Sequence, residues 1–586
     1  MNRFMQTLLV FSMTAISITT CFAATPLAKE AKPSHFEKLI NEFFDNAYFK
    51  FNPTQGTAAG LHQYDAQLED YTKAGVEKNI AVLRSYRQKI ENSKPKAGTI
   101  EVSDRDLVLH YIDGALLELE TIRQWEKNPD RYSSNISNSA FVIMARKFAA
   151  PEARLRSLIA REKQMPAVFD AARSNLKNPP HIYTEIAISQ LPGIISFFEK
   201  DVPLAFKEVT DKTLIAEFGQ SNAAVVEALR SYQKFLKDDL LARSSGDFRI
   251  GADTFAKKLM YDEMVDIPLD KLLEFGYANL RHNQQWFKET AAKLDPKKTP
   301  AQILDDIGHD HPAPGKLLQT FRDTLGGIED FIESHHIVTI PSKVQPILEE
   351  TPPFARALTF ASMDTPGPFE KVATEAYFNV TLPESNWTPQ EVEEHMEGFN
   401  YGTIVSTAVH EAYPGHYVQF LWVPAAPSKV RKLLGANSDV EGWAHYCEQM
   451  MLDEGYGAAK GQNSPEFLKL RLGQLQDALL RNARFIVGIQ MHTGKMTFDE
   501  GVNYFVKEGY QSKSNGIRET RRGTSDPTYL VYTLGKLQIM KLREDYKKQR
   551  GDKFSLQEFH DAFLKQGFPP VKVVRRQMLG NDSPTL

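Results

Sequence analysis

The stretch HEAYPGHY, residues 410–417, begins like the zinc-peptidase motif HExxH but places its second histidine two residues late. In HExxH the histidines lie four residues apart on one helix face and share a metal ion, and the glutamate is the general base. On an unbroken helix, His410 and His416 would be separated by about 240°. Pro414 interrupts helical hydrogen bonding, and Gly415 can adopt a positive φ. We expect a bulge that returns His416 to the ligand position; the alternative is a helix end with His416 at the surface.

A second segment, DVEGWAHYCEQMMLDEG at residues 439–455, has the spacing of a metal-binding helix. Glu441, His445 and Glu448 lie at i, i+4 and i+7, on one face of an otherwise apolar helix. Such a stripe is costly unless its members are paired or bind a metal. Zinc sites with two histidines and one glutamate take their third ligand from a separate downstream helix. The segment therefore favours a metal site within residues 401–455, and the alternative is a solvated face closed by ion pairs.

A third segment, RETRRGTSDPTYLVYTLGK at residues 518–536, carries groups that suit peptide hydrolysis. Tyr529 or Tyr532 could donate a hydrogen bond to a developing oxyanion. Guanidinium groups can hold a substrate carboxylate through two parallel hydrogen bonds. The segment has three of them, on Arg518, Arg521 and Arg522. The alternative for the tyrosines is an ordinary place in the core.

The segment GHDHPAPG, residues 308–315, holds a further histidine pair. His309 and His311 could bind a metal as a surface pair. We expect a loop without metal instead, because the sequence predicts no carboxylate-bearing helix to follow the pair.

Charge and cysteine usage limit the class of protein. The chain of 586 residues has a net charge of −4 and a pI of about 6.5, so it lacks the basic excess typical of nucleic-acid binding. Its two cysteines are Cys21 and Cys447. If the chain is cleaved after Ala23, no internal disulfide is possible, and the fold depends on its core.

The N-terminus resembles an export signal. Arg3 precedes the apolar run LLVFSMTAISITT and the small residues of CFAA. We therefore expect residues 1–23 to be a signal peptide that directs the protein to the periplasm or the medium. Lipoprotein cleavage before Cys21 is less favoured, because Thr19 and Thr20 are unusual in that signal. No later run of 18 apolar residues predicts a membrane span.

The rest of the chain predicts a mainly α protein with a small β-sheet before the metal-binding helix. Residues 24–34 are a polar linker, and residues 35–586 are expected to form a single large helical catalytic domain. Three β-rich segments, HIVTIPSKVQPI, ARALTFASM and EAYFNVTLP, lie within residues 336–383 and predict strands. The last is expected to be an edge strand that could pair with an extended peptide. Thr388 begins a capping box with proline at the first helical position, so a helix should start there.

Three motifs resemble a large, mostly bacterial family catalogued as domain of unknown function 885. They are HEAYPGH, EGWAHYCEQ and RRGTSDPTYLVYTLGKL. The resemblance extends over nearly the whole mature chain, including residues 51–72 and 363–383. The family is regarded as zincin-like, with a helical fold similar to carboxypeptidase Taq and thimet oligopeptidase. It implies His410, His416 and Glu441 as Zn²⁺ ligands and Glu411 as the base.

The chain departs from the family pattern at one position. Many members read GHH where Tyr417 follows His416 in this sequence. The related oligopeptidases use a tyrosine near a segment rich in glycine and tyrosine to assist the oxyanion, which favours Tyr529 and Tyr532 for that role.

These patterns together predict an exported zinc peptidase that hydrolyses short peptides. Zinc lowers the pKa of its bound water and polarises the scissile carbonyl, and Glu411 is the general base. Tyr529 or Tyr532, with His445 near, supports the oxyanion, and Arg522 binds substrate. The alternatives are a zinc hydrolase of a non-peptide amide or ester and a non-catalytic periplasmic binding or scaffold protein. Glu411 argues against the second alternative, because binding alone does not need a base. The sequence predicts neither the position of cleavage nor the oligomeric state.

Overall fold

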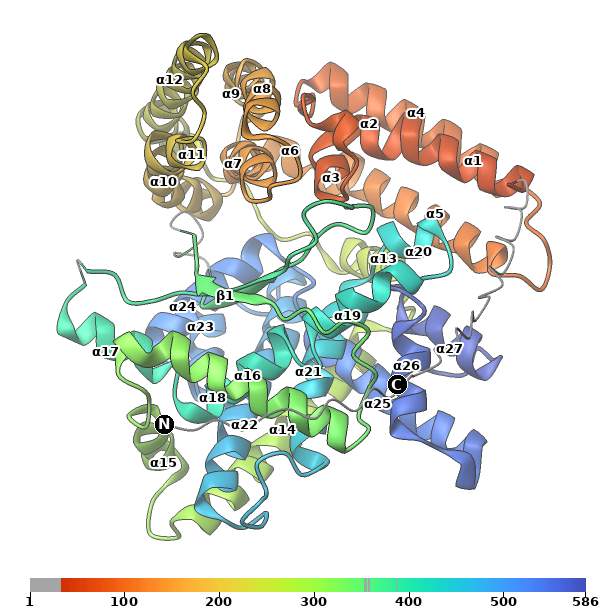
Figure 1. The fold of residues 1–586 in the computed structure, drawn as a ribbon, viewed down its shortest axis with the longest axis vertical. Helices are drawn as coiled ribbons and strands as arrows, with labels where there is room; N and C mark the ends of the chain where they lie inside the picture. The colour runs from red at the N-terminus through yellow and green to blue at the C-terminus, as the bar shows by residue number, and fades with distance from the viewer. Residues whose placement is uncertain (1–32, 353–355, 357–358, 386) are drawn as a thin grey trace, which may run out of the picture.

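The computed structural model describes residues 33–352, 356, 359–385 and 387–586. The predicted signal peptide and most of the predicted linker lie outside these residues. The N-terminal part of the fold, red to yellow in Figure 1, is a layer of helices. These helices are α1 (His35–Phe43), α2 (Phe49–Phe51), α3 (Pro53–Ala58), α4 (Lys73–Glu91), α5 (Glu101–Leu116), α6 (Gln124–Lys127), α7 (Asp130–Met144), α8 (Pro151–Glu162), α9 (Met165–Asn175), α10 (His181–Ser196), α11 (Val202–Ala205) and α12 (Lys212–Phe235).

The larger C-terminal part is also helical and contains the three motifs (Figure 1). Its helices are α13 (Ala252–Glu263), α14 (Leu269–Leu294), α15 (Pro300–Gly308), α16 (Leu317–Ser334), α17 (Pro389–Glu397), α18 (Tyr401–Glu411), α19 (His416–Trp422), α20 (Lys429–Leu433), α21 (Asn437–Asp453), α22 (Pro465–His492), α23 (Phe498–Lys507), α24 (Lys513–Ser525), α25 (Val531–Arg550), α26 (Leu556–Leu564) and α27 (Val571–Leu579). The two parts meet where α5 contacts α13 and α20 and where α10 contacts α24. Among the described residues, no helix is both long and apolar enough to cross a membrane.

A small sheet precedes the motif helices, as the sequence predicts. Its strands are β1 (Ile347–Glu350), β2 (Ala361–Asp364) and β3 (Tyr377–Val380). The order is β1-β3-β2, with β3 parallel to β1 and antiparallel to β2. The fold class, mainly α with a small sheet, is confirmed.

Two details of the predicted strands are wrong. The segment HIVTIPSKVQPI contributes only its last residue to β1, because Pro341 and Pro346 cannot donate ladder hydrogen bonds. EAYFNVTLP contains β3, the central strand of the sheet, so it cannot be the edge that pairs with a peptide. The β-forming composition of a segment does not reveal its place in the strand order.

Helix α17 begins where the capping box predicts. The hydroxyl of Thr388 accepts the backbone N–H of Glu391, and the Glu391 carboxylate accepts the backbone N–H of Thr388 at 2.7 Å. Pro389 occupies the first helical position, where a missing N–H costs nothing.

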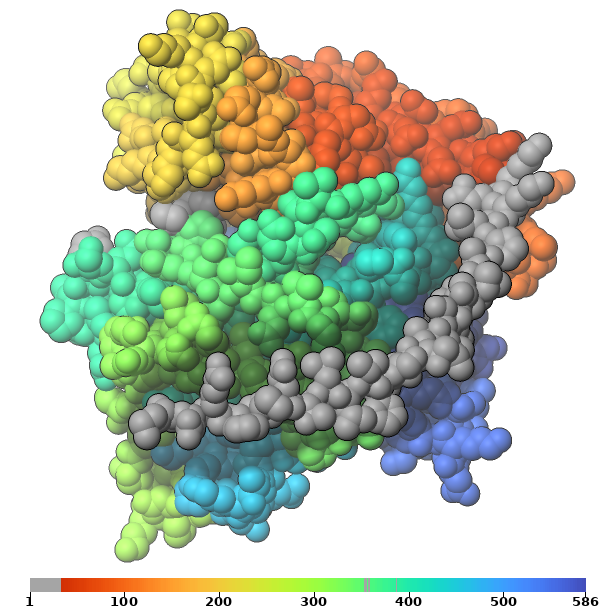
Figure 2. Space-filling view, in the orientation of Figure 1, coloured from red at the N-terminus to blue at the C-terminus, as the bar shows by residue number. Residues whose placement is uncertain are grey.

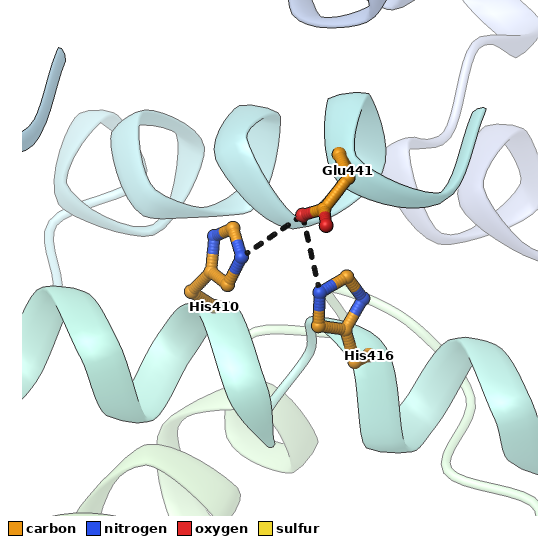
Figure 3. Close-up of side chains that lie close together, drawn as sticks. All are labelled: His410, His416 and Glu441. Carbon is orange, nitrogen blue, oxygen red and sulfur yellow. Dashed lines mark ion pairs between the residues drawn. The ribbon is translucent and has the colours of Figure 1, made fainter. Parts of the chain in front are cut away.

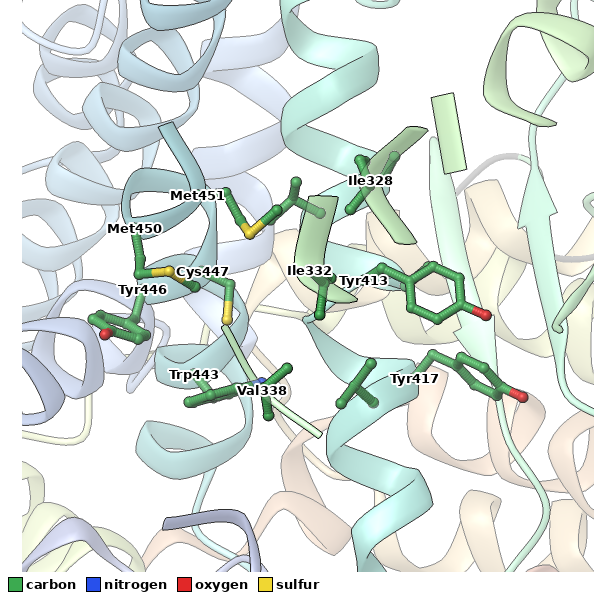
Figure 4. Close-up of a cluster of buried hydrophobic side chains, with 14 of the residues drawn as sticks. Ile328, Ile332, Val338, Tyr413, Tyr417, Trp443, Tyr446, Cys447, Met450 and Met451 are labelled. Atoms are coloured by element: carbon green, nitrogen blue, oxygen red, sulfur yellow. The ribbon is translucent and has the colours of Figure 1, made fainter. Parts of the chain in front are cut away.

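A buried apolar cluster supports the helices of the motifs (Figure 4). Trp443 and Cys447 of α21 pack there with Ile328 and Ile332 of α16, and all four are almost fully buried. Cys447 is therefore a small core residue rather than an accessible thiol. The apolar face of α21 is anchored in this cluster, and its polar stripe faces α18 and α22.

Helices α21 and α25 cross with their backbones in contact at two glycines. A Cβ on Gly535 would lie 1.8 Å from the carbonyl oxygen of Ser438, and a Cβ on Gly442 would lie 2.5 Å from the Cα of Gly535. Both distances are too short for any side chain. The crossing brings the first turn of α25 against the first turns of α21.

Candidate metal centre

The chain between the two histidines forms a break between helices, not a bulge within one helix. Helix α18 ends at Glu411 and α19 starts at His416, so the expected single bulged helix is wrong. Gly415 has φ −65°, so a positive φ is not its role. Its N–H donates to the carbonyl of Val409 at 3.0 Å, and a Cβ there would lie 1.9 Å from the carbonyl oxygen of His410. Glycine is required because the chain folds back against α18.

This break brings the two imidazoles to one carboxylate. The Nε2 atoms of His410 and His416 each lie 3.4 Å from Oε2 of Glu441 (Figure 3). One donor atom from each residue lies within 4.8 Å of the others. Oε2 of Glu441 is buried, and the two imidazoles are its partners among the described residues. The three residues assigned as ligands by resemblance therefore form one group of donors with converging atoms.

Behind this group, a buried carboxylate orients His410. Nδ1 of His410 lies 2.7 Å from Glu448, whose side chain is fully buried. Arg481 pairs with Glu448 at 3.1 Å, and His445 contacts its other oxygen at 3.0 Å. A carboxylate on Nδ1 holds the imidazole with Nε2 facing the metal position. The sequence stripe contained Glu448 but did not predict this role, and Arg481 was missed because nothing in the pattern of α22 relates it to α21.

Burial and contacts between the residues of this group shift their pKa values. Burial lowers the pKa of His410, but hydrogen bonds with Glu441 and Glu448 outweigh it and raise that pKa to about 9. Burial raises the pKa of Glu441, and hydrogen bonds with both histidines outweigh that effect, so this pKa lies well below its usual range. Burial raises the pKa of Glu411, whose side chain lies at the end of α18 beside these groups. The donor group therefore combines the Glu441 carboxylate with positive charge on the imidazole of His410 that faces it.

Tyr532 is the tyrosine that reaches this group. Its hydroxyl donates to Oε1 of Glu441 at 3.0 Å and accepts from Arg522 at 3.3 Å. The guanidinium carbons of Arg481, Arg484 and Arg522 lie 5.5, 5.0 and 5.8 Å from the centre of its ring. The crossing of α25 over α21 produces this contact, which links two residues 91 positions apart. Sequence reasoning named Arg522 but missed Arg484.

Two other predicted site residues, Tyr529 and His445, do not contact the three donor residues. Tyr529 is 1% exposed and packs in a separate core cluster with Val487, Met491 and Phe505. His445 is fully buried, its described hydrogen bond is with Glu448, and burial lowers its pKa to about 3. Contact with the donor group therefore distinguishes Tyr532 from Tyr529.

Comparison with known protein families matches residues 53–578 to the family described as "Bacterial protein of unknown function (DUF885)". The chain belongs to the DUF885 family. No curated protein matches the chain.

Two solved structures resemble this DUF885 protein over nearly its whole length. A "putative lipoprotein of unknown function" from Shewanella oneidensis is 27% identical, with a TM-score of 0.77, over 93% of this chain and 100% of that chain. A "putative lipoprotein" from Colwellia psychrerythraea is 18% identical, with a TM-score of 0.76, over 93% of this chain and 99% of that chain. The second likeness concerns the fold alone.

Tyr417, where the sequence departs from the expected family pattern, contacts residues outside the donor group. The Tyr417 hydroxyl donates to the carbonyl of Val344, and its ring packs edge-on against Tyr413 at 5.6 Å. Figure 4 shows both tyrosines among the side chains of the buried apolar cluster. Position 417 therefore adds no donor to the group in this DUF885 protein.

A second, exposed donor group involves the histidine pair of residues 308–315. His309, Glu393 and Glu397 have donor atoms within 4.8 Å of one another, and His311 lies 3.3 Å from Glu393. Helix α17, which carries Glu393 and Glu397, follows the two histidines in the sequence. The expectation that no carboxylate-bearing helix follows them is therefore wrong. Unlike the first group, this one is exposed, and no buried carboxylate orients its imidazoles.

Replacing Gly415 by alanine should destabilise the break between α18 and α19. The added Cβ would overlap the His410 carbonyl, and overpacking of this kind costs about 1–3 kcal/mol. We expect a lower thermal midpoint, measured by circular dichroism. Gly219→Ala on exposed α12 is the control, since its Cβ meets no atom, and it should be neutral or stabilising by up to about 1 kcal/mol. Equal midpoints for Gly415→Ala and the wild type would contradict the assigned role.

Proposed function

We propose that this protein is a zinc-dependent peptidase that hydrolyses short peptides. The observation that carries the proposal is the convergence of His410, His416 and Glu441, with Glu411 directly beside the first histidine. Two imidazole nitrogens and one carboxylate oxygen form the donor set of hydrolytic zinc sites, which keep one position open. The buried oxygen of Glu441 that faces both imidazoles and the carboxylate on Nδ1 of His410 fit this assignment.

The residues around the donor group supply the remaining functions of the proposed reaction. When bound, zinc polarises a carbonyl and lowers the pKa of water. Glu411 accepts the proton of the attacking water on a carboxylate oxygen and donates it to the leaving amine. The Tyr532 hydroxyl donates a hydrogen bond to the carbonyl oxygen as negative charge develops there. Arg522, which contacts that hydroxyl, binds the C-terminal carboxylate of the peptide.

Strand β2 is the element that could align an extended peptide. Among the described residues, β2 pairs with β3 on one side and with no strand on the other. The backbone of Met363 in β2 contacts the Glu411 carboxylate. A peptide added to this free edge would run past Glu411, as in β-augmentation. The segment EAYFNVTLP cannot take this role, because it contains the central strand β3.

The proposal includes a relationship to helical zinc peptidases such as carboxypeptidase Taq and thimet oligopeptidase, which the motifs resemble. A peptide library should be digested with the zinc-loaded protein, with and without a chelator, and the products read by mass spectrometry. We expect cleavage that the chelator abolishes. Cleavage of amides or esters but of no peptide would favour the non-peptide hydrolase, and zinc binding without any hydrolysis would favour a binding protein.

Tyr532 and Arg522 should affect different kinetic constants. An oxyanion donor acts in the transition state, so Tyr532→Phe should lower kcat about 10²-fold with little change in KM. Arg522→Ala should raise KM for peptides with a free C-terminus, because it removes ground-state binding. Steady-state kinetics on free and amidated peptides checks both effects. Tyr529→Phe is the matched control and should keep kcat, since Tyr529 lies in another cluster. Equal cleavage of free and amidated peptides would exclude Arg522 as the carboxylate anchor.

We further propose that the protein is exported. The N-terminal segment has the pattern of an export signal, and the structural neighbour from Shewanella oneidensis is described as a "putative lipoprotein". This neighbour gives no support to the lower weight placed on lipid attachment at Cys21. Mass spectrometry of the native mature protein distinguishes a free N-terminus at Ala24 from a lipidated Cys21, and either result is compatible with export. An intact Met1 on the native protein would contradict it.

A further inference from the structure

A large cavity lies between the two parts of the fold. Its volume is about 670 Å³, within the range of about 300–1,000 Å³ that is usual for ligand sites. Helices α4, α5 and α7 of the N-terminal layer form one side, and α13 and the start of α21 form the other. Figure 2 shows the seam along which the N-terminal layer, red to yellow, meets the rest of the molecule. None of the three zinc-ligand candidates lines this cavity.

The walls of the cavity are rich in aromatic side chains that keep part of their surface exposed. They are Tyr48, Phe51, Tyr71, Tyr111, Trp125 and Tyr261. Half-buried rings offer π-faces, and such faces attract cations at close range.

Carboxylates outnumber basic side chains in the lining. Glu118 pairs with Arg131 at 3.3 Å, and Asp262 pairs with Lys258 at 2.7 Å. Apart from His110, the basic residues of the lining are Arg131 and Lys258, and each is already neutralised by its ion pair.

Two further lining carboxylates, on Glu69 and Asp70, have no basic partner within ion-pair distance among the described residues. Glu69 accepts the N–H and hydroxyl of Thr54, and Asp70 accepts those of Thr72. Such hydrogen bonds orient a carboxylate without removing its charge. The cavity therefore attracts positive charge.

The cavity borders the start of α21, the helix that carries Glu441. Asn437, the first residue of α21, lines it, and Glu263 of the lining accepts the backbone N–H of Ser438 at 2.9 Å. Glu441 follows four residues after Asn437, which is about 6 Å along the helix axis. Helix α21 therefore lines the cavity with its first residue and carries Glu441 one turn later.

We propose that this cavity binds a lysine- or arginine-bearing part of the peptide substrate, so that the enzyme prefers basic peptides. The proposal rests on the proposed peptidase function, and it adds the class of substrate. The cationic side chain would lie between the aromatic faces and the unpaired carboxylates of Glu69 and Asp70.

Binding can be tested without turnover in the full-length Glu411→Gln variant loaded with zinc. The probes are an octapeptide containing two lysines and the same peptide with norleucine, which lacks the charge, at both positions. Isothermal titration calorimetry should give a Kd about tenfold lower for the lysine peptide at low salt, and the difference should shrink at high salt. The lysine peptide should also change the tryptophan fluorescence, and Trp125→Phe should remove that change.

The charge of the cavity is tested by Glu69→Gln combined with Asp70→Asn, which keep the side-chain shapes. The preference for the lysine peptide should fall to about twofold or less, since the unpaired charge is gone. Glu77→Gln combined with Glu91→Gln is the matched control, because it removes two charges of α4 outside the lining and should keep the preference.

Equal binding of the two peptides to the parent variant would overturn the cavity proposal while leaving peptide hydrolysis by the wild type intact. Tight binding of the lysine peptide to a wild-type protein that never cleaves it would instead overturn the peptidase function and support the cavity as a cationic peptide site.

Discussion

Glu411→Gln is expected to lower kcat for peptide cleavage about 10²–10⁴-fold, the usual contribution of a general base. The change is nearly isosteric and removes only the ability of the side chain to take up a proton. Because Glu411 is not among the three converging donors, bound zinc should stay at the wild-type level. Steady-state kinetics on a cleaved peptide and elemental analysis of the same sample measure the two quantities together.

Glu397→Gln is the matched control for this variant. Both glutamates are the last residues of their helices, α17 and α18, but Glu397 belongs to the exposed second group. It should keep the wild-type kcat. If Glu411→Gln cleaved peptides at the wild-type rate, the base would have to be another residue.

His416→Ala should remove the tightly bound zinc. The wild type is expected to keep about one equivalent per chain after mild dialysis, because three protein ligands hold the ion. The variant retains only His410 and Glu441 as donors, so the measured zinc should fall close to zero, together with activity. Elemental analysis gives the stoichiometry, and far-ultraviolet circular dichroism checks that the helical fold persists.

The control for the metal is His309→Ala, which removes an imidazole from the exposed group. That group lacks a buried carboxylate behind its histidines, so the tight equivalent should remain in this variant. Equal zinc retention in His416→Ala and His309→Ala would contradict the assignment of the buried group.

The helical class and several local features were predictable because they depend on short-range patterns. The capping box at Thr388 determines the start of α17 from residues three positions apart. The spacing within residues 439–455 places Glu441, His445 and Glu448 on one helix. Pro414 and Gly415 marked an interruption correctly, although the structure forms two helices there instead of one bulged helix.

The remaining features depend on how distant segments pack. Tyr529 and Tyr532 are three residues apart and chemically identical, and the crossing of α21 and α25 alone places Tyr532 at Glu441. The pairing of Arg481 with Glu448 likewise joins two helices whose relative position no local pattern encodes. The strand order that makes β3 central is a property of the whole sheet.

The contact of Gly442 with Gly535 has a consequence for sequence divergence. Where two main chains touch, the separation of the helices is independent of the size of the surrounding side chains. Substitutions in the neighbouring apolar cluster can therefore accumulate without changing the distance between Glu441 and Tyr532. Over evolutionary time the core can drift while the contact of Tyr532 with Glu441 persists, provided that both glycines are retained. Their joint presence is thus a criterion for selecting distant relatives in which the same donor group should be sought.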